Sequence, residues 1–207
     1  FPAAFIFAVH PVNVEAVAWI TQRKSTLPMV FYLLSILFFL RFDETGNKKD
    51  YAISLLAFPL ALLAKTSAVM QPFALLGCIW WRRRKFTRED LIRVLPYFGI
   101  AFILSLVTIW FQYNRSIGDD IVRTDSLIAR IAGVGWVVWF YIYKALVPLK
   151  LIFVYPRWEI DPAKLTTWIP NLGLLITFMV CWWKRQSWGR PCLFGLGYFV
   201  ITLFPII

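Results

Sequence analysis

Long apolar runs separated by short polar segments dominate this chain of 207 residues. A helix needs about 20 apolar residues to cross a bilayer, and flanking polar side chains extend shorter runs. The runs lack the alternation over about ten residues that is typical of a membrane β-barrel. We therefore expect an all-α fold, a polytopic transmembrane helix bundle with six or seven spanning helices. The uncharged runs are 1–9, 25–40, 51–64, 66–81, 94–114, 131–143, 165–183 and 191–207.

Residues 128–156 do not fit a chain whose successive helices cross the bilayer in alternating directions. If the run 131–143 crosses the bilayer, the chain must return before Arg157, and residues 151–156 are too few to span it. We expect a re-entrant or interfacial hairpin with its bend near Pro148, which indicates a cavity lined by protein. The sequence starts and stops inside apolar runs, so we expect residues 1–207 to be part of a single larger membrane domain, truncated at both ends.

Composition and charge support a membrane location. The chain is 60% hydrophobic and 16% charged, with a mean hydropathy of +0.67, whereas a soluble domain is about 25% charged. The formal net charge is +11, but the basic residues lie in short loops, which indicates membrane orientation rather than nucleic-acid binding. We expect the loops 41–50, 82–90 and 184–190 to be cytoplasmic. The segments between them, which carry most of the acids, are expected outside.

No motif for soluble-type catalysis or for metal binding is present. The three cysteines, Cys78, Cys181 and Cys192, lie in apolar runs at unpatterned spacings, as buried small hydrophobic residues do. A Walker loop, a GxSxG elbow, an HExxH pair and a dinucleotide fingerprint are all missing from the sequence. We therefore expect neither a metal site nor a cofactor.

Candidate catalytic groups lie in the segment HPVNVEAVAWITQRKSTL, where ionisable residues are flanked by apolar sequence. Such groups are costly to keep near a bilayer and are functional candidates by default. Glu15 is either an acid favoured at a helix start or a carboxylate that activates an acceptor hydroxyl. His10 is either a hydrogen-bonded interfacial residue or a catalytic partner of Glu15. Arg23 and Lys24 either extend to lipid headgroups or bind a phosphate.

Two further cations are candidate anion contacts on the outer side. Lys65 stands alone between two apolar runs in LLAKTSAVMQP, and it is expected on the same face as Arg23 and Lys24. Arg157 follows the expected hairpin in VYPRWE. A polar turn residue explains Lys65 and a solvated arginine explains Arg157 if neither binds an anion.

The order of these motifs resembles that of a known family. HPVNVEAVAWITQRKSTL, LLAKTSAVMQPFALL, WRRRK, YKALVPLKLIFVYPRW and GYFVITLFPII follow one another as in the membrane region of bacterial tetratricopeptide-repeat proteins. That region is similar to the animal transmembrane O-mannosyltransferases with C-terminal tetratricopeptide repeats, and to the GT-C glycosyltransferase superfamily. The resemblance covers nearly the whole chain, although no tetratricopeptide repeat lies within it.

The resemblance implies a GT-C enzyme that transfers a sugar, often mannose, from a polyprenyl phosphate to an acceptor outside the cytoplasm. The family's acidic residue of the first outer loop would lie upstream of residue 1. In this scheme Glu15 and His10 serve as catalytic residues, and Arg23, Lys24, Lys65 and Arg157 bind the lipid phosphate. The implied partners are membrane lipid, a lipid-linked sugar, and either a protein acceptor or a partner of the tetratricopeptide repeats, in the bacterial inner membrane.

Two other functions fit the same sequence. A non-catalytic membrane scaffold could anchor tetratricopeptide repeats that bind partners, and it would tolerate replacement of Glu15, Arg23 and Lys65. A lipid or solute transporter would show inverted repeats and broken helices near the membrane midplane. No convincing repeat is visible, although the expected hairpin is compatible with transport.

Overall fold

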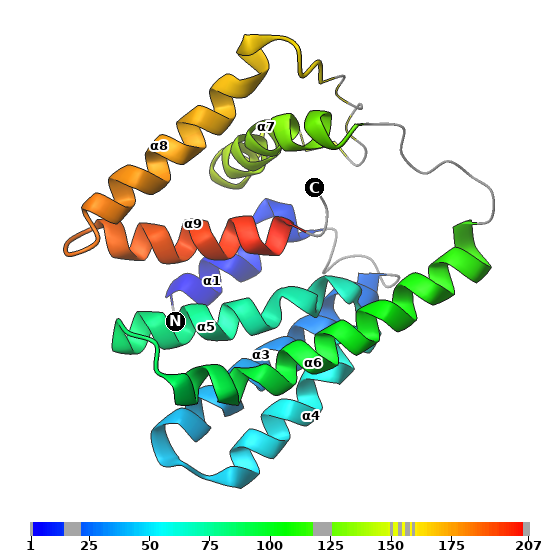
Figure 1. Ribbon diagram of the computed structural model, residues 1–207, viewed down its shortest axis with the longest axis vertical. Coiled ribbons are helices and arrows are strands. Elements are labelled where there is room, and N and C mark those ends of the chain that lie inside the picture. Colours follow the sequence, from blue (N-terminus) through cyan, green and yellow to red (C-terminus); the bar gives the residue numbers. More distant parts are fainter. Residues whose placement is uncertain are drawn as a thin grey trace. The chain divides into compact units, whose positions relative to one another are not determined.

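The computed structural model describes residues 2–14, 22–117, 126–149, 151–152, 155, 158 and 160–204. Every regular element in that part of the chain is helical, which confirms the predicted all-α fold (Figure 1). By length and composition, four of the described helical segments can cross a bilayer. They are Lys24–Thr45, Arg88–Asn114, Leu127–Leu146 and Leu165–Trp183. The total of six or seven crossings stays a prediction.

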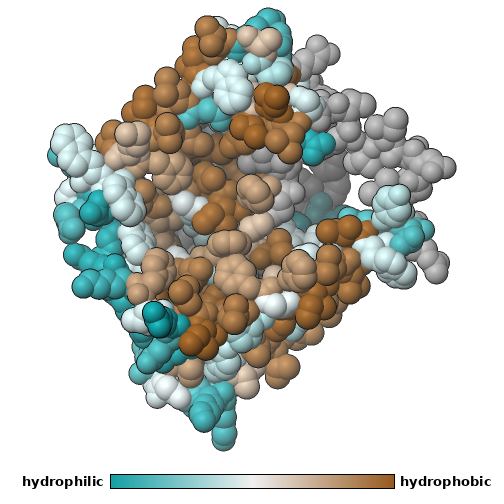
Figure 2. All heavy atoms as spheres, in the orientation of Figure 1, coloured by the Kyte–Doolittle hydropathy of each residue, from teal (hydrophilic) through white to brown (hydrophobic). Residues whose placement is uncertain are grey.

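Apolar side chains cover much of the surface shown in Figure 2. Large hydrophobic residues such as Leu33, Phe102 and Trp110 are exposed on the four segments that can cross a bilayer. Soluble monomers rarely expose contiguous apolar patches larger than a few hundred Å², whereas lipid-facing helices require them. The surface therefore agrees with a polytopic membrane bundle.

The chain forms two compact units, and the helices of each pack among themselves. Unit 1 comprises Phe1–Val14 and Ile121–Ile207, and unit 2 comprises Glu15–Asp120. That residues 1–207 belong to a single membrane domain stays a prediction. Unit 1 holds α1 (Pro2–Val9), η1 (Pro11–Asn13), α7 (Leu127–Leu146), η5 (Leu165–Trp168), α8 (Ile169–Trp183) and α9 (Gly189–Leu203). Unit 2 holds α3 (Arg23–Thr45), α4 (Lys48–Ala64), η3 (Thr66–Met70), α5 (Gln71–Arg83), α6 (Arg88–Phe111) and η4 (Gln112–Ile117).

Unit 2 begins with a hairpin of α3 and α4 (Figure 1). The turn needs a residue with positive φ, and Gly46 supplies it at φ 69° while its N–H donates to Phe42 O over 2.8 Å. Asn47 then caps α4, because its side-chain oxygen accepts a hydrogen bond from Lys49 N at 3.1 Å. Only residues 46–47 of the expected loop 41–50 form the turn, because residues 41–45 belong to α3 and residues 48–50 to α4.

Ion pairs join the turn between α3 and α4 to the turn between α5 and α6. The Asp43 carboxylate, only 6% exposed, pairs with Arg83 and lies 3.8 Å from Arg82 and 3.5 Å from Arg93. Arg83 also donates to the fully buried Asp90 over 2.8 Å. These pairs place both basic turns at one end of unit 2, as expected for two cytoplasmic loops. The side of the membrane stays a prediction.

Three buried polar side chains connect α3, α4 and α6 inside unit 2. Ser35 Oγ donates to Ser54 O at 2.9 Å, and Ser54 Oγ donates to Ser35 O at 2.5 Å. Tyr97 OH donates to Ser54 Oγ at 2.7 Å. All three residues are fully buried. Each hydroxyl therefore has a partner, as buried polar groups require.

We expect Ser54→Ala to lower the free energy of unfolding by about 1–2 kcal/mol. The change removes two interhelical hydrogen bonds and leaves the buried Tyr97 hydroxyl without its acceptor. Unfolding of the detergent-solubilised protein by added SDS, followed by circular dichroism, measures this. Thr108→Val is the control, since the Thr108 hydroxyl bonds only to Leu104 O of its own helix among the described contacts. Equal stabilities of the two variants would contradict the role of the buried network.

Unit 1 is built on close contact between α7 and α8. Asn171 of α8 accepts a hydrogen bond from Gly135 N at 2.9 Å, and its Nδ2 donates to Ala132 O at 2.7 Å. A Cβ atom at Gly135 would lie 2.6 Å from Pro170 C and 2.9 Å from Asn171 Cα. The two backbones therefore approach too closely for any residue other than glycine.

The expected hairpin over residues 128–156 starts with one continuous helix. α7 has 20 residues and ends at Leu146, after which Leu149 N donates to Val147 O across Pro148 at 2.7 Å. The chain therefore turns at Pro148, where the sequence places the bend. Several residues of the return arm, including Pro156, lie outside the described residues, and the path of the hairpin in the bilayer stays a prediction.

Candidate functional site

Lys65 lies beside the first turn of α3. It follows α4 in an extended conformation (φ −157°, ψ 123°), so its exposed side chain leaves the helix axis. Its Nζ donates to Ser25 Oγ over 3.2 Å, and Ser25 Oγ donates in turn to Gln22 Oε1 over 3.1 Å. The antiparallel packing of α3 and α4 explains this contact, because it brings the end of one helix to the start of the other.

Positive charge gathers at this helix start. Arg23 and Lys24 are the first two residues of α3, and the first turn contains no acid. Cations are disfavoured there, because the helix dipole places partial positive charge at the N-terminus. Gln22, at the N-cap position, makes no side-chain capping hydrogen bond. Cations beside the N-terminus of a helix attract anions, so a phosphate site here stays a prediction.

Arg23, Lys24 and Lys65 are called the Lys65 cluster. It lies at the end of unit 2 opposite to the ion pairs around Asp43. The 17 residues of α4 separate Lys65 from the turn between α3 and α4. At 1.5 Å per residue that separation is about 25 Å, close to the thickness of the hydrocarbon core. A bilayer that surrounds unit 2 would therefore place Lys65 and the basic turns near its two opposite faces.

His10 takes part in a different set of contacts, in unit 1. Its Nε2 donates to Ala145 O at 2.9 Å and its Nδ1 accepts from Val12 N at 3.3 Å. One neutral tautomer, with the proton on Nε2, satisfies both contacts. His10 therefore ties the turn after α1 to the last turn of α7. To act as a base it would have to give up the bond from Val12, and its catalytic role stays a prediction.

The other predicted site residues are described only in part. Glu15 and Arg157 lie outside the described residues, and of Arg23 only the backbone is described. Lys24 is exposed in the first turn of α3. The structure thus brings Lys65 to the start of α3, where Arg23 and Lys24 begin the helix, and it places His10 in the other unit.

Two polar residues of the cluster were not predicted as site residues. Ser25 and Gln22 connect Lys65 to the start of α3, and each is half-buried. Their position directly beside Arg23 and Lys24 is the only signal that the sequence gives for them. Within the described part of the chain, no group of three or more His, Cys, Asp or Glu residues could hold a metal ion.

Comparison with known proteins identifies the family. Residues 1–112, more than half of the chain, match the family described as dolichyl-phosphate-mannose-protein mannosyltransferase. The chain belongs to this family, which confirms the predicted GT-C relationship. The match covers the candidate cluster at Lys65 and the turn at His10. Together with the apolar helices it shows an integral membrane protein.

Two curated relatives carry the name O-mannosyl-transferase. Protein O-mannosyl-transferase F38B6.6 of Caenorhabditis elegans is 25% identical over 158 residues, which are 75% of this chain and 22% of that protein. Protein O-mannosyl-transferase TMTC4 of Mus musculus is 48% identical over 48 residues, which are 23% of this chain and 6% of that protein. The chain thus spans less than a quarter of either relative. No solved structure matches it significantly.

Proposed function

We propose that the full-length protein transfers a sugar from a polyprenyl-phosphate donor to a protein hydroxyl on the non-cytoplasmic face of the bacterial inner membrane. Mannose is the first candidate, because the family and both relatives are named for mannosyl transfer. The observation that carries the proposal is the contact between Lys65 and the first turn of α3. It gathers positive charge at one end of a bundle of apolar helices.

The chemistry calls for positive charge at this place. The bond between the anomeric carbon of the sugar and a phosphate oxygen breaks, and the polyprenyl phosphate leaves with the bonding electrons. Negative charge therefore develops on the phosphate in the transition state, where fixed cations stabilise it. We assign this role to Lys65, Lys24, Arg23 and the N-terminus of α3, with Arg157 as a further contact.

The acceptor must lose a proton as its oxygen bonds to the anomeric carbon. A carboxylate within hydrogen-bond reach of the hydroxyl serves as the base. We assign this role to Glu15, which follows the turn that His10 ties to α7. His10 then acts mainly as a positioning residue. This scheme uses only residues of the chain and the two substrates.

We expect Lys65→Met to reduce sugar transfer about tenfold to hundredfold, which corresponds to about 1.4–2.7 kcal/mol of lost transition-state stabilisation. The measurement is transfer of radiolabelled mannose from a polyprenyl phosphate by the full-length protein in lipid vesicles. Lys49→Met is the matched control, because Lys49 is also an exposed cation and lies at the other end of α4. We expect its transfer rate to stay within about twofold of the wild type.

Three other results would contradict parts of the proposed function. If Lys65→Met transfers as fast as the wild type, the phosphate does not bind at this cluster. If Glu15→Gln transfers normally, the base is not Glu15 and lies in another segment of the full-length protein. If the wild type transfers no sugar from any polyprenyl phosphate, the membrane-scaffold function is favoured.

A further inference from the structure

The end of α8 and the start of α9 lie against each other in unit 1. The turn between them is short, because Ser187 N donates to Lys184 O at 2.9 Å and Gly189 N donates to the same carbonyl at 3.1 Å. A Cβ atom at Gly189 would overlap the carbonyl oxygen of Cys181 and lie 2.7 Å from Lys184 C. The backbone of α9 therefore starts directly beside that of α8, at a distance that only glycine permits.

This turn brings two cysteines together. Cys181 lies in the last turn of α8 and Cys192 in the first turn of α9, and their thiol groups share a hydrogen bond. The two helices run antiparallel, so residues at similar distances from the turn lie opposite each other. The close approach of the backbones at Gly189 favours a covalent bond, because a disulfide needs Cα atoms within about 7 Å of each other.

The two thiols differ in their access to solvent. The side chain of Cys181 is buried, with 4% of the residue exposed, whereas Cys192 is exposed. The sequence predicts a buried small hydrophobic residue at both positions, and the structure places only Cys181 in that way. The charged residues Lys184 and Arg185 follow α8 directly, so the pair lies at the polar end of the helical hairpin. A dissolved reagent can therefore reach Cys192 but not Cys181.

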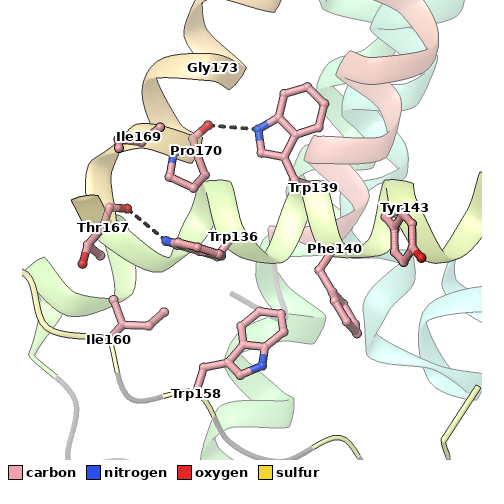
Figure 3. A pocket seen from close by; sticks show the side chains of 10 residues that line it. All are labelled: Trp136, Trp139, Phe140, Tyr143, Trp158, Ile160, Thr167, Ile169, Pro170 and Gly173. Carbon is pink, nitrogen blue, oxygen red and sulfur yellow. Dashed lines mark hydrogen bonds between the residues drawn. The ribbon is translucent and has the colours of Figure 1, made fainter. Parts of the chain in front are cut away.

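The other end of α8 is already fixed by α7. Trp139 Nε1 donates to Pro170 O at 3.0 Å, and Trp136 Nε1 donates to Thr167 O of η5 at 3.1 Å (Figure 3). The aromatic face of α7 and the start of α8 border a pocket of about 840 Å³ within unit 1. A covalent bond between the two thiols would fix the end of α8 to α9, as these hydrogen bonds fix its start to α7.

We propose that Cys181 and Cys192 form a reversible disulfide that fastens α9 to the end of α8 under oxidising conditions. The oxidant is a small-molecule disulfide such as oxidised glutathione. The turn between the two helices is expected on the cytoplasmic side, where thiols are kept reduced and disulfides are usually transient. The pair is therefore a modification site that responds to the redox state. No step of the proposed sugar transfer enters this inference.

The disulfide forms by two successive thiol–disulfide exchanges. The Cys192 thiol loses its proton to water, and its sulfur attacks one sulfur of the oxidant, whose S–S bond breaks as one glutathione thiolate leaves. The Cys181 thiol then loses its proton, and its sulfur attacks Cys192 Sγ as the second glutathione thiolate leaves. Two electrons pass from the cysteines to the oxidant, which takes up the two protons and becomes two thiols. Access sets this order, since only Cys192 is exposed.

The test compares the full-length wild type with Cys181→Ala, Cys192→Ala and Cys78→Ala. Cys78 lies in α5 of unit 2, so its variant is the matched control. Circular dichroism and thermal unfolding in reductant verify that each variant is folded. Each reduced protein in detergent is incubated with oxidised glutathione, and the remaining thiols are blocked with N-ethylmaleimide. Mass spectrometry of peptides then locates disulfides and glutathione adducts.

The variants should trap different stages of the reaction. In the wild type and in Cys78→Ala we expect at least about tenfold more disulfide between Cys181 and Cys192 than glutathione adduct at Cys192. Cys181→Ala should keep glutathione on Cys192, because the thiol that would expel it is missing. Cys192→Ala should leave Cys181 as a thiol, because the oxidant cannot reach it.

Reversal by reductant is the second readout. Oxidation should raise the apparent unfolding temperature of the wild type, and dithiothreitol should restore the original value. The unfolding temperature of Cys192→Ala should respond to neither reagent. A hydrogen bond between two thiols without redox chemistry would produce no such dependence.

Three results would overturn the proposal. They are a wild type that forms no disulfide between the two cysteines, a wild type that keeps as much glutathione on Cys192 as Cys181→Ala does, and a Cys192 that N-ethylmaleimide does not label in the folded protein. The readouts involve no sugar transfer, so this proposal and the proposed function can fail separately. An inactive wild type that forms the disulfide contradicts only the proposed function.

Discussion

Gly135→Ala is expected to lower the free energy of unfolding by about 3 kcal/mol or more. The added methyl group would overlap the α8 backbone, 2.6 Å from Pro170 C and 2.9 Å from Asn171 Cα. Backbone atoms cannot rotate away as a side chain can, so α7 and α8 must separate. That movement also breaks the two hydrogen bonds of Asn171 to α7, each worth about 0.6 kcal/mol or more in a membrane protein.

The direction of the stability change tests whether a helix glycine is in close contact with a neighbouring backbone. In a helix interior alanine is favoured over glycine by about 1 kcal/mol, so a glycine without close neighbours should gain stability on replacement. A Cβ atom at Gly197 would have no neighbour within 4 Å, and Gly197→Ala is therefore the control. SDS-induced unfolding in detergent measures both variants. If Gly135→Ala is as stable as Gly197→Ala, the close contact of α7 with α8 is wrong.

Asp43→Asn is expected to cost about 2–3 kcal/mol of stability. Asp43 is almost completely buried and faces Arg82, Arg83 and Arg93, so its removal leaves three partly buried cations without their shared carboxylate. Loss of one partner from a buried ion pair is costly, although Arg82, Arg83 and Arg93 each keep one other acidic partner, Glu44, Asp90 and Glu89 respectively. The helix ends that Asp43 joins should separate first.

Glu44→Gln is the matched control for Asp43→Asn. Glu44 is the next residue and also pairs with Arg82, but its side chain is 59% exposed. An exposed ion pair contributes about 0–1 kcal/mol, so we expect a small change. Chemical unfolding followed by tryptophan fluorescence compares the two variants. Similar losses in both would show that burial of Asp43 does not set the cost.

Helix positions followed closely from the apolar runs, but helix ends did not. The run 25–40 stops before Arg41, whereas α3 continues to Thr45 because Asp43 and Glu44 pair with arginines of α5 and α6. The run 66–81 carries no charge that marks a boundary, yet the chain changes from the 3-10 turn η3 to α5 at Gln71. Pro72 explains that change, since its missing N–H cannot continue the hydrogen-bond ladder but is tolerated in a first helical turn.

The sequence identified residues of the candidate site, but it did not predict the contacts between them. Lys65, Arg23 and Lys24 stand out because they are cations next to apolar runs. Keeping a charged group near the bilayer costs free energy, so such residues are candidates for a function. The spacing of 40 residues between Ser25 and Lys65 says nothing of their hydrogen bond, which depends on how α3 and α4 pack. The same holds for His10 and Ala145, which are 135 residues apart.

The sequence by itself determined the membrane class, the all-α fold, the basic turns and the family motifs. Hydropathy and charge are local properties of the chain, and they decide how segments insert into a bilayer. Only the tertiary structure decided which helices share buried polar contacts, where glycine is obligatory, and that the aromatic face of α7 borders a pocket. Those features depend on the distance between segments far apart in the chain. The sequence contains both partners of each such contact, but only packing brings them within hydrogen-bond or van der Waals reach.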